Sequence, residues 1–142
     1  MVLVDTSVWV EVFRRGTSFH LESIADLEEV VTCLPVIQEV LQGFRDERAF
    51  QLARESMYAL PVVESPLDAV VFDEAIGLYR RGRHAGLTVR SSVDCLIAAC
   101  ALRHGLTVLH RDRDFGRLSR ISPLQARDIR TTVTRDDAKG GQ

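Results

Sequence analysis

Short apolar segments separated by helical patterns dominate the chain. Four of these segments are rich in Val, Leu and Ile without regular polar alternation, which is typical of strands covered on both faces of a parallel sheet. A fifth and weaker strand is predicted near the C-terminus. The predicted strands are residues 2–4, 30–34, 60–63, 106–109 and 124–129.

Between these strands, apolar residues recur three and four positions apart, as on the buried face of a helix. The clearest pattern follows Ser91 and Ser92 and ends at Gly105. Pro61 places the third strand at a sheet edge, because proline cannot donate a ladder hydrogen bond. The predicted helices are residues 8–15, 19–29, 35–44, 46–59, 65–80 and 93–103, with a short helix from residue 115. Strands that alternate with helices predict an α/β fold with a parallel sheet.

The length of 142 residues, 46% of them hydrophobic and 27% charged, indicates one globular domain. We expect residues 1–130 to form this domain and residues 131–142 to form a polar, disordered tail. No apolar stretch approaches the roughly 20 residues of a membrane-spanning helix, and no basic segment precedes an apolar one at the N-terminus. We therefore expect a cytoplasmic bacterial protein without a membrane partner.

Three cysteines, an odd number, lie in apolar surroundings and lack the close spacing of zinc ligands. We interpret Cys33, Cys95 and Cys100 as reduced residues of the core. This interpretation agrees with a reducing cytosol, where disulfides are rare.

The charges are unevenly distributed, although the formal net charge is only −2. Residues 1–79 hold 14 acidic and 5 basic residues, whereas residues 80–142 hold 6 acidic and 13 basic ones. A basic half of this kind indicates a surface that could follow the phosphates of a nucleic acid. A solvated charged surface, or pairing between the two halves, would explain the same distribution.

Acidic residues stand where predicted strands meet helices. Asp5 follows the first strand, and Asp112 and Asp114 follow the fourth; each could simply cap the next helix. Asp94 lies in the first turn of its helix, where the helix dipole stabilises an acid. Glu39 lies away from the centre of the apolar stripe of its helix and could be an ordinary exposed residue. Each acid taken alone therefore has a structural explanation.

Taken together, the acids indicate a shared site. Right-handed strand–helix–strand connections bring the carboxyl ends of parallel strands to one edge of a sheet. Two carboxylates 4 Å apart repel by about 4 kcal/mol at an effective dielectric constant near 20, which a proton or a cation can offset. Carboxylate oxygens suit Mg²⁺ or Mn²⁺, and such ions support the hydrolysis of phosphodiesters.

Four sequence motifs in this order resemble those of PIN-domain ribonucleases and, more narrowly, of the VapC toxins of bacterial VapBC toxin–antitoxin pairs. The resemblance extends over nearly all of the chain up to about residue 130. The motifs are VLVDTSVW at residues 2–9, VIQEVLQG at 36–43, SSVDCLIAA at 91–99 and LHRDRDF at 109–115.

The resemblance implies a three-layer α/β/α sandwich with a five-stranded parallel sheet in the order 3-2-1-4-5. It implies a Mg²⁺- or Mn²⁺-dependent endoribonuclease toxin of a type II toxin–antitoxin system, which cleaves tRNA or a ribosomal RNA loop and so inhibits translation. It also implies a homodimer neutralised by a VapB-type antitoxin, with operator DNA bound only through the antitoxin.

The resemblance also assigns roles to individual residues. Asp5, Glu39, Asp94 and Asp112 match the acidic quartet expected to bind the metal, and Asp114 competes with Asp112 for the fourth place. The hydroxyl of Thr6 or Ser7 would support metal-bound water or the scissile phosphate. His110 departs from the family, which often has Thr or Ser there; we favour a structural role over RNA contact. The expected contacts to the RNA backbone are Arg90, Arg111, Arg113 and Arg117.

Two other classes of protein share some of these features. A phospho-acceptor signalling domain also gathers acids at the end of a parallel sheet, but it needs a lysine after a late strand, and Lys139 is the only lysine. A non-cleaving PIN-like module that binds RNA or protein would not need all four acids. A housekeeping nuclease is a further alternative within the enzyme class, although the small size favours a toxin.

Overall fold

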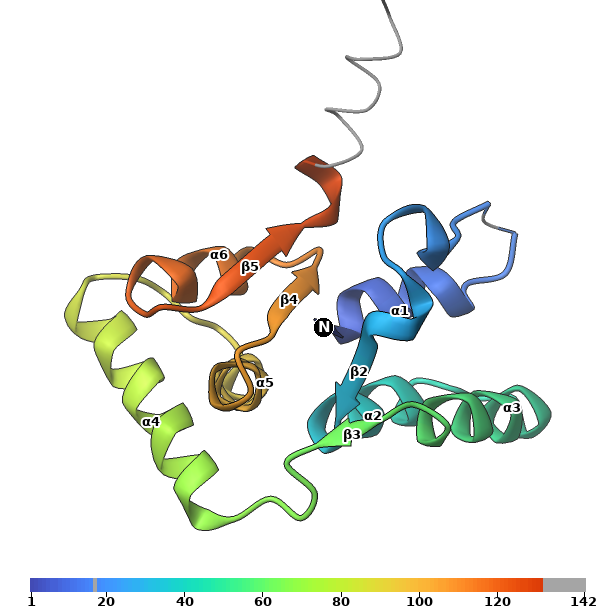
Figure 1. Cartoon of the computed structure of the whole chain (residues 1–142), viewed down its shortest axis with the longest axis horizontal. Coiled ribbons are helices and arrows are strands. Elements are labelled where there is room, and N and C mark those ends of the chain that lie inside the picture. Colours follow the sequence, from blue (N-terminus) through green and yellow to red (C-terminus); the bar gives the residue numbers. More distant parts are fainter. Residues whose placement is uncertain (17, 132–142) are drawn as a thin grey trace, which may run out of the picture.

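Five parallel strands form one sheet in the computed structural model, which describes residues 1–16 and 18–131 (Figure 1). The strand order β3-β2-β1-β4-β5 confirms the predicted order. All four neighbouring pairs are parallel, so β1 at the centre is paired on both sides. The strands are β1 (Val2–Val4), β2 (Val30–Cys33), β3 (Val62–Val63), β4 (Thr107–His110) and β5 (Gln125–Asp128).

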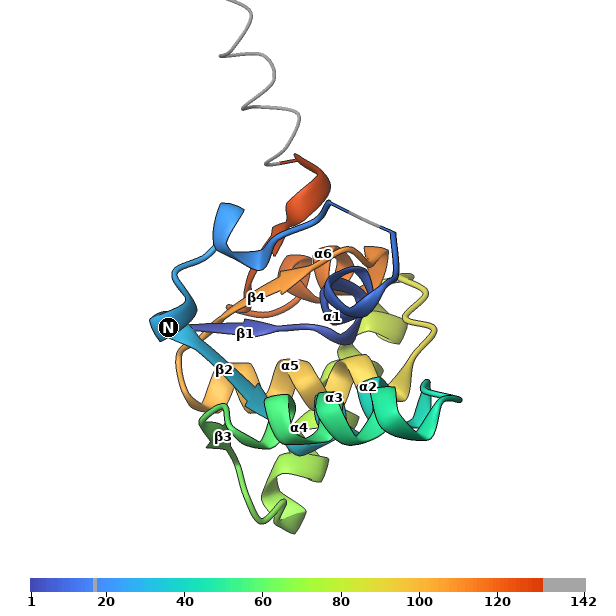
Figure 2. The same ribbon diagram turned by 90° about the vertical axis from the view of Figure 1, so that its right-hand side faces the viewer.

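Residues 1–16 and 18–131 form six α-helices around the sheet. Helix α5 lies on one side of the central strands, and α1 and α6 lie on the other, which gives the predicted three layers (Figure 2). The helices are α1 (Thr6–Phe13), α2 (Leu34–Gln42), α3 (Glu47–Tyr58), α4 (Ala69–His84), α5 (Ser92–Arg103) and α6 (Arg113–Arg120). Across residues 1–16 and 18–131, we find no helix whose length and apolar character would let it span a bilayer.

The core is formed where the central strands meet the helices. Leu3 of β1 and Val108 of β4 are fully buried, as expected for strands covered on both faces. Ile97 of α5 and Phe115 of α6 are also fully buried. The three cysteines are buried and form no disulfide, which confirms their predicted place in the core.

The predicted helix over residues 19–29 is wrong. The segment forms two 3-10 turns instead, η1 (Leu21–Ser23) and η2 (Leu27–Glu29). The Asp26 carboxylate accepts a hydrogen bond from Glu28 N and starts the second turn separately, and Leu27 remains 48% exposed. Helix α4 also begins later than predicted, at Ala69 instead of residue 65. Residues 132–142 of the predicted tail lie outside the described residues.

Three strands run directly into helices at the same edge of the sheet. Asp5 joins β1 to α1, Cys33 joins β2 to α2, and β4 leads to α6 through Asp112. Asp5 N donates a 2.9 Å hydrogen bond to Leu109 O, which fixes the end of β1 against β4. This edge therefore collects the residues for which a shared site is predicted.

Candidate active site

Asp5 caps α1 with one carboxylate oxygen and leaves the other without a partner. Oδ2 accepts hydrogen bonds from Ser7 N at 3.0 Å and from Ser7 Oγ at 2.6 Å. Asp5 is only 2% exposed, and its Oδ1 is buried with no hydrogen-bond partner. A buried acceptor without a partner is costly, so this oxygen is available for a cation or a proton. The helix cap and a ligand role are thus compatible.

The hydroxyls of Thr6 and Ser7 hold the acids in place. Thr6 Oγ1 donates to Glu39 Oε1 at 2.9 Å, which connects α1 to α2. Ser7 Oγ donates to Asp5 and accepts a 2.9 Å hydrogen bond from Arg111 N, just beyond β4. These hydroxyls were expected to support metal-bound water or the scissile phosphate. In the structure they bind the carboxylates of Asp5 and Glu39 and the backbone of Arg111.

Asp94 belongs to both groups of neighbouring acidic residues. It lies in the first turn of α5, where the N-cap Ser91 accepts a 3.2 Å hydrogen bond from Asp94 N. The side chain is buried, and Oδ2 has no hydrogen-bond partner. Asp94 shares one group of ligand atoms within 4.8 Å with Asp5 and Glu39, and a second group with Asp112 and Asp114. The five acids predicted from sequence are thus brought together.

Asp112 and Asp114 are distinguished by their hydrogen bonds. Asp114 Oδ2 accepts from the backbone N–H groups of Arg90 (3.0 Å) and Ser91 (3.1 Å), and Oδ1 accepts from Arg117 Nη1 at 3.1 Å. Asp112 caps α6 through Oδ1, which accepts from Asp114 N at 2.9 Å, and its carboxyl group faces Asp94. The geometry favours Asp112 as a ligand, because both oxygens of Asp114 already bind donors of the chain.

The electrostatic environment disfavours the ionised acids. Burial raises the pKa of Asp5 to about 6, despite the hydrogen bonds from Ser7 that lower it. Burial, together with the charges of Asp5 and Asp112, raises the pKa of Asp94 to about 9. A divalent cation would offset both the burial and the repulsion. The unpartnered oxygens and the all-oxygen donor set therefore fit Mg²⁺ or Mn²⁺.

His110 has a structural role, as the sequence interpretation favours. Its Nδ1 accepts a 3.2 Å hydrogen bond from Asp112 N, and its ring packs 5.3 Å from that of Phe115. Burial lowers the pKa of His110, so the neutral ring with the proton on Nε2 is favoured. His110 therefore fixes the backbone that carries Asp112.

The four arginines expected to contact RNA differ in whether they form ion pairs within the chain. Arg111 Nη1 pairs with Glu11 Oε1 at 2.6 Å, and Arg117 pairs with Asp114. Arg90 and Arg113 are exposed and form no ion pair within the described part of the chain. The pairing of Arg111 with Glu11 spans 100 positions and leaves no sequence pattern, whereas the i,i+3 spacing of Asp114 and Arg117 on one helix was a local signal that could have indicated their pairing.

The chain is similar to known proteins over most of its length. The PIN domain family model matches residues 2–121. Ribonuclease VapC11 of Mycobacterium tuberculosis is 42% identical over 135 residues, which cover 92% of this chain and all of that protein.

Two solved structures share the fold. A DNA-bound VapBC complex from Salmonella typhimurium has a TM-score of 0.71 at 18% identity, over 90% of this chain and 98% of that one. M. tuberculosis VapC20, described as a sarcin–ricin loop cleaving toxin, has a TM-score of 0.64 at 22% identity, over 82% and 93%. With five acids at the predicted edge of the sheet and these similarities, the chain belongs to the PIN-domain family, among the VapC ribonucleases.

Proposed function

We propose that this chain is the toxin of a VapBC-type pair, an endoribonuclease that requires Mg²⁺ or Mn²⁺. Its substrate is structured RNA, either tRNA or an exposed ribosomal RNA loop, and cleavage inhibits translation. The similarity to ribonuclease VapC11 and to VapC20, a sarcin–ricin loop cleaving toxin, supports this class of substrate. Two alternative functions lose support. A phospho-acceptor domain needs a lysine after a late strand, and this chain has only Lys139 near its C-terminus. A non-cleaving module would not need buried acids.

The observation that carries this proposal is the position of Asp94 between two groups of acids. Its ligand atoms form one group with those of Asp5 and Glu39 and a second group with those of Asp112 and Asp114. We propose that Asp5 and Asp94 hold the principal ion, while Glu39 and Asp112 bind through water or complete a second site. When bound, such an ion supplies positive charge to the phosphate and makes a coordinated water more acidic.

The surrounding residues orient these acids. Ser7 fixes the Asp5 carboxylate, Thr6 fixes Glu39, and His110 fixes the backbone of Asp112. Support of this kind preserves the geometry needed for in-line attack by water. The expected products are 5′-phosphate and 3′-hydroxyl ends, formed without the ribose 2′-hydroxyl as nucleophile.

The exposed Arg90 and Arg113 are proposed as the main contacts to the RNA backbone. Each guanidinium can bind a phosphate with two hydrogen bonds. Arg111 and Arg117 would add to the positive potential, but their charges are already compensated by Glu11 and Asp114. We therefore expect them to contribute less to RNA affinity.

An antitoxin partner fits the apolar grooves beside the site. One groove of about 480 Å³ lies between α4 and α5, and a second of about 270 Å³ extends to Glu39. Phe72, Val93 and Leu96 line both, so a bound segment could continue from one to the other and reach the acids. We propose that a segment of a VapB-type antitoxin occupies them, and that operator DNA is bound only through the antitoxin. A cytoplasmic homodimer is proposed from the family resemblance.

A cleavage assay tests the proposed activity. The purified chain is incubated with total bacterial RNA in Mg²⁺, in Mn²⁺ or in EDTA, and the cleaved ends are mapped. We expect discrete cuts with either ion, none in EDTA, and none with Asp5→Asn in the same buffers. Binding of RNA without any cut in Mg²⁺ or Mn²⁺ would instead support the non-cleaving module.

A further inference from the structure

The last turns of α4 and the segment after it enclose a recess of about 230 Å³. Its lining combines an aromatic ring and a guanidinium with aliphatic side chains. Pockets for drug-sized ligands measure roughly 300–1,000 Å³, so this recess suits a single planar ring system. The lining residues are Tyr79, Arg83, Leu87, Thr88 and Val89.

Close packing against Gly82 fixes one wall of the recess. Leu87 N donates a 2.9 Å hydrogen bond to Gly82 O. A Cβ atom at Gly82 would lie 3.3 Å from Val89 Cγ2, so the missing side chain allows residues 87–89 to pack tightly on α4. The wall facing Tyr79 and Arg83 is therefore held by the fold.

The segment that lines the recess continues directly into the residues that bind Asp114. Asp114 Oδ2 accepts hydrogen bonds from Arg90 N and Ser91 N, which follow Val89 in the chain. Because consecutive Cα atoms are about 3.8 Å apart, Val89 lies within about 10 Å of the Asp114 carboxylate. Figure 2 shows residues 85–91 on the side of the molecule toward which β1 points. A strand bound at the acids would therefore pass near the recess.

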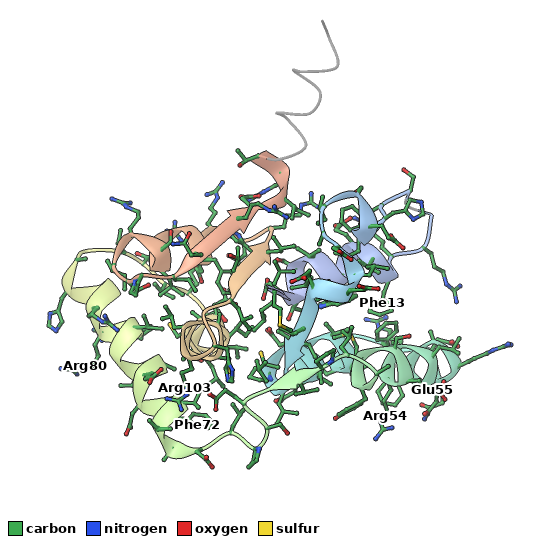
Figure 3. All side chains as sticks on the ribbon, viewed as in Figure 1. Phe13, Arg54, Glu55, Phe72, Arg80 and Arg103 are labelled. Atoms are coloured by element: carbon green, nitrogen blue, oxygen red, sulfur yellow. The ribbon has the colours of Figure 1, made fainter. Side chains whose placement is uncertain are left out.

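The chain segment that forms the recess is positively charged, which favours a polyanion as its ligand. Residues 79–90 contain four arginines and one histidine but no acidic residue. Arg80 projects outward from α4 into solvent (Figure 3). Cations near the C-terminus of α4 also stabilise its dipole, but that effect requires neither Tyr79 nor Arg90, which lies beyond the helix.

We propose that this recess receives one unpaired nucleobase of the RNA substrate, stacked on Tyr79, while Arg83 contacts a neighbouring phosphate. This inference rests on the proposed ribonuclease function. Proteins commonly recognise single-stranded RNA by stacking splayed bases on aromatic rings and by contacting phosphates with arginine. The preferred substrate is then a loop or bulge with an unpaired nucleotide beside the cleaved bond, in contrast to a continuous duplex.

The test compares the binding of two labelled RNAs by fluorescence anisotropy: a 12-nucleotide single strand of mixed sequence and the matching 12-base-pair duplex. All proteins carry Asp94→Asn, so that the RNA remains uncut in Mg²⁺. We expect Tyr79→Ala to weaken single-strand binding about tenfold, the scale of one stacked base, and to leave duplex binding unchanged. Tyr79→Phe should retain the single-strand affinity. A single strand with abasic sites throughout should bind the parent protein and the Tyr79→Ala variant equally.

Helix α3 offers a matched control, because Arg54 and Tyr58 are also an Arg–Tyr pair four residues apart. Arg54 lies 5.0 Å above the Tyr58 ring, and Figure 3 shows Arg54 on the opposite side of the molecule from Arg80. Tyr58→Ala should not affect either RNA.

Equal single-strand affinity for the Tyr79→Ala and parent proteins would overturn the inference, as would equal losses for single strand and duplex. Total RNA is treated in parallel with the unsubstituted chain. If the unsubstituted chain cleaves total RNA while Tyr79→Ala leaves the single-strand affinity unchanged, the recess is not a base-binding site and the proposed ribonuclease function still holds. An unsubstituted chain that neither binds nor cuts RNA refutes both. Binding of an acidic antitoxin peptide, but not RNA, through Tyr79 would also overturn it.

Discussion

The hydroxyl of Thr6 donates a 2.9 Å hydrogen bond to Glu39 Oε1, across 33 positions of sequence. This contact fixes the Glu39 side chain, which is only partly buried on α2. Without this hydrogen bond, the Glu39 side chain would lose rotamer entropy each time it bound an ion; with it, that entropy is already lost in the folded protein. The Thr6 hydroxyl therefore acts as a support for a proposed metal ligand.

Removing this hydroxyl should weaken metal binding without unfolding the protein. Thr6→Val keeps the shape of the side chain, and the loss of a hydrogen bond behind a ligand typically reduces metal affinity or activity by about 10- to 100-fold. The measurement is the Mn²⁺ concentration that gives half-maximal RNA cleavage. Thr107→Val, at the start of β4 on the opposite edge of the sheet, is the control. Equal Mn²⁺ requirements for both variants would remove Thr6 from the site.

Asp94→Asn and Asp114→Asn should change the stability of the metal-free protein in opposite directions. Asp94 is buried with an unpartnered oxygen and a raised pKa, so a neutral amide should stabilise the fold at pH 8 by about 1–4 kcal/mol. Asp114 accepts three hydrogen bonds, one of them from Arg117, so the same change should destabilise by about 1–3 kcal/mol. Urea unfolding in EDTA measures both. Destabilisation by Asp94→Asn comparable to that of Asp114→Asn would contradict the assignment of Asp94 as a ligand.

The stability of the metal-free protein should fall as the pH rises from 7 to 9. The unfolded chain releases the Asp94 proton near pH 3.8, whereas the folded chain keeps it until about pH 9. The unfolded state therefore binds fewer protons in this range, and each pH unit costs up to about 1.4 kcal/mol. Thermal unfolding in EDTA across this range provides the measurement. Saturating Mg²⁺ or the Asp94→Asn change should flatten the profile; an equally steep fall in Asp94→Asn would assign the effect to another group.

The arginines should differ in their effect on RNA affinity. Arg113→Ala removes an exposed, unpaired charge and should make the plot of log affinity against log salt shallower by about 0.7–0.9 if one phosphate contact is lost. Arg111→Ala removes a charge already paired with Glu11 and should have a smaller effect. Salt titrations of RNA binding, with the exposed Arg48→Ala on α3 as control, distinguish them. Identical slopes for Arg113→Ala and Arg48→Ala would exclude Arg113 from the RNA-binding surface.

The fold could largely be predicted because its strongest signals are local. Val2–Val4 and Thr107–His110 lie within or beside apolar runs, and Pro61 correctly indicated an edge, although the strand order itself came from the family resemblance. The segment over residues 19–29 was mispredicted because Leu21, Ile24 and Ala25 have helical spacing. Asp26 nevertheless breaks the segment by capping a separate turn, and spacing alone does not reveal such a cap.

The acids of the site could be predicted, but their division of roles could not. Asp112 and Asp114 both precede or begin a helix and are equivalent in sequence. They are distinguished by the bonds from Arg90 N and Ser91 N to Asp114, which depend on how α5 meets α6. The contact of Ser7 with Arg111 N spans 104 positions and likewise leaves no local pattern. Tertiary hydrogen bonds of this kind require coordinates.

The most direct test of the account is anomalous diffraction from crystals of the full chain grown with Mn²⁺. We expect an anomalous peak bound by Asp94 together with Asp5, and a second peak toward Asp112 if two ions bind. Asp94→Asn crystals should lose the peak while keeping the fold. A peak outside this group of acids, or none within it under conditions where the chain cleaves RNA with Mn²⁺, would contradict the proposal that these carboxylates form the metal site of a ribonuclease.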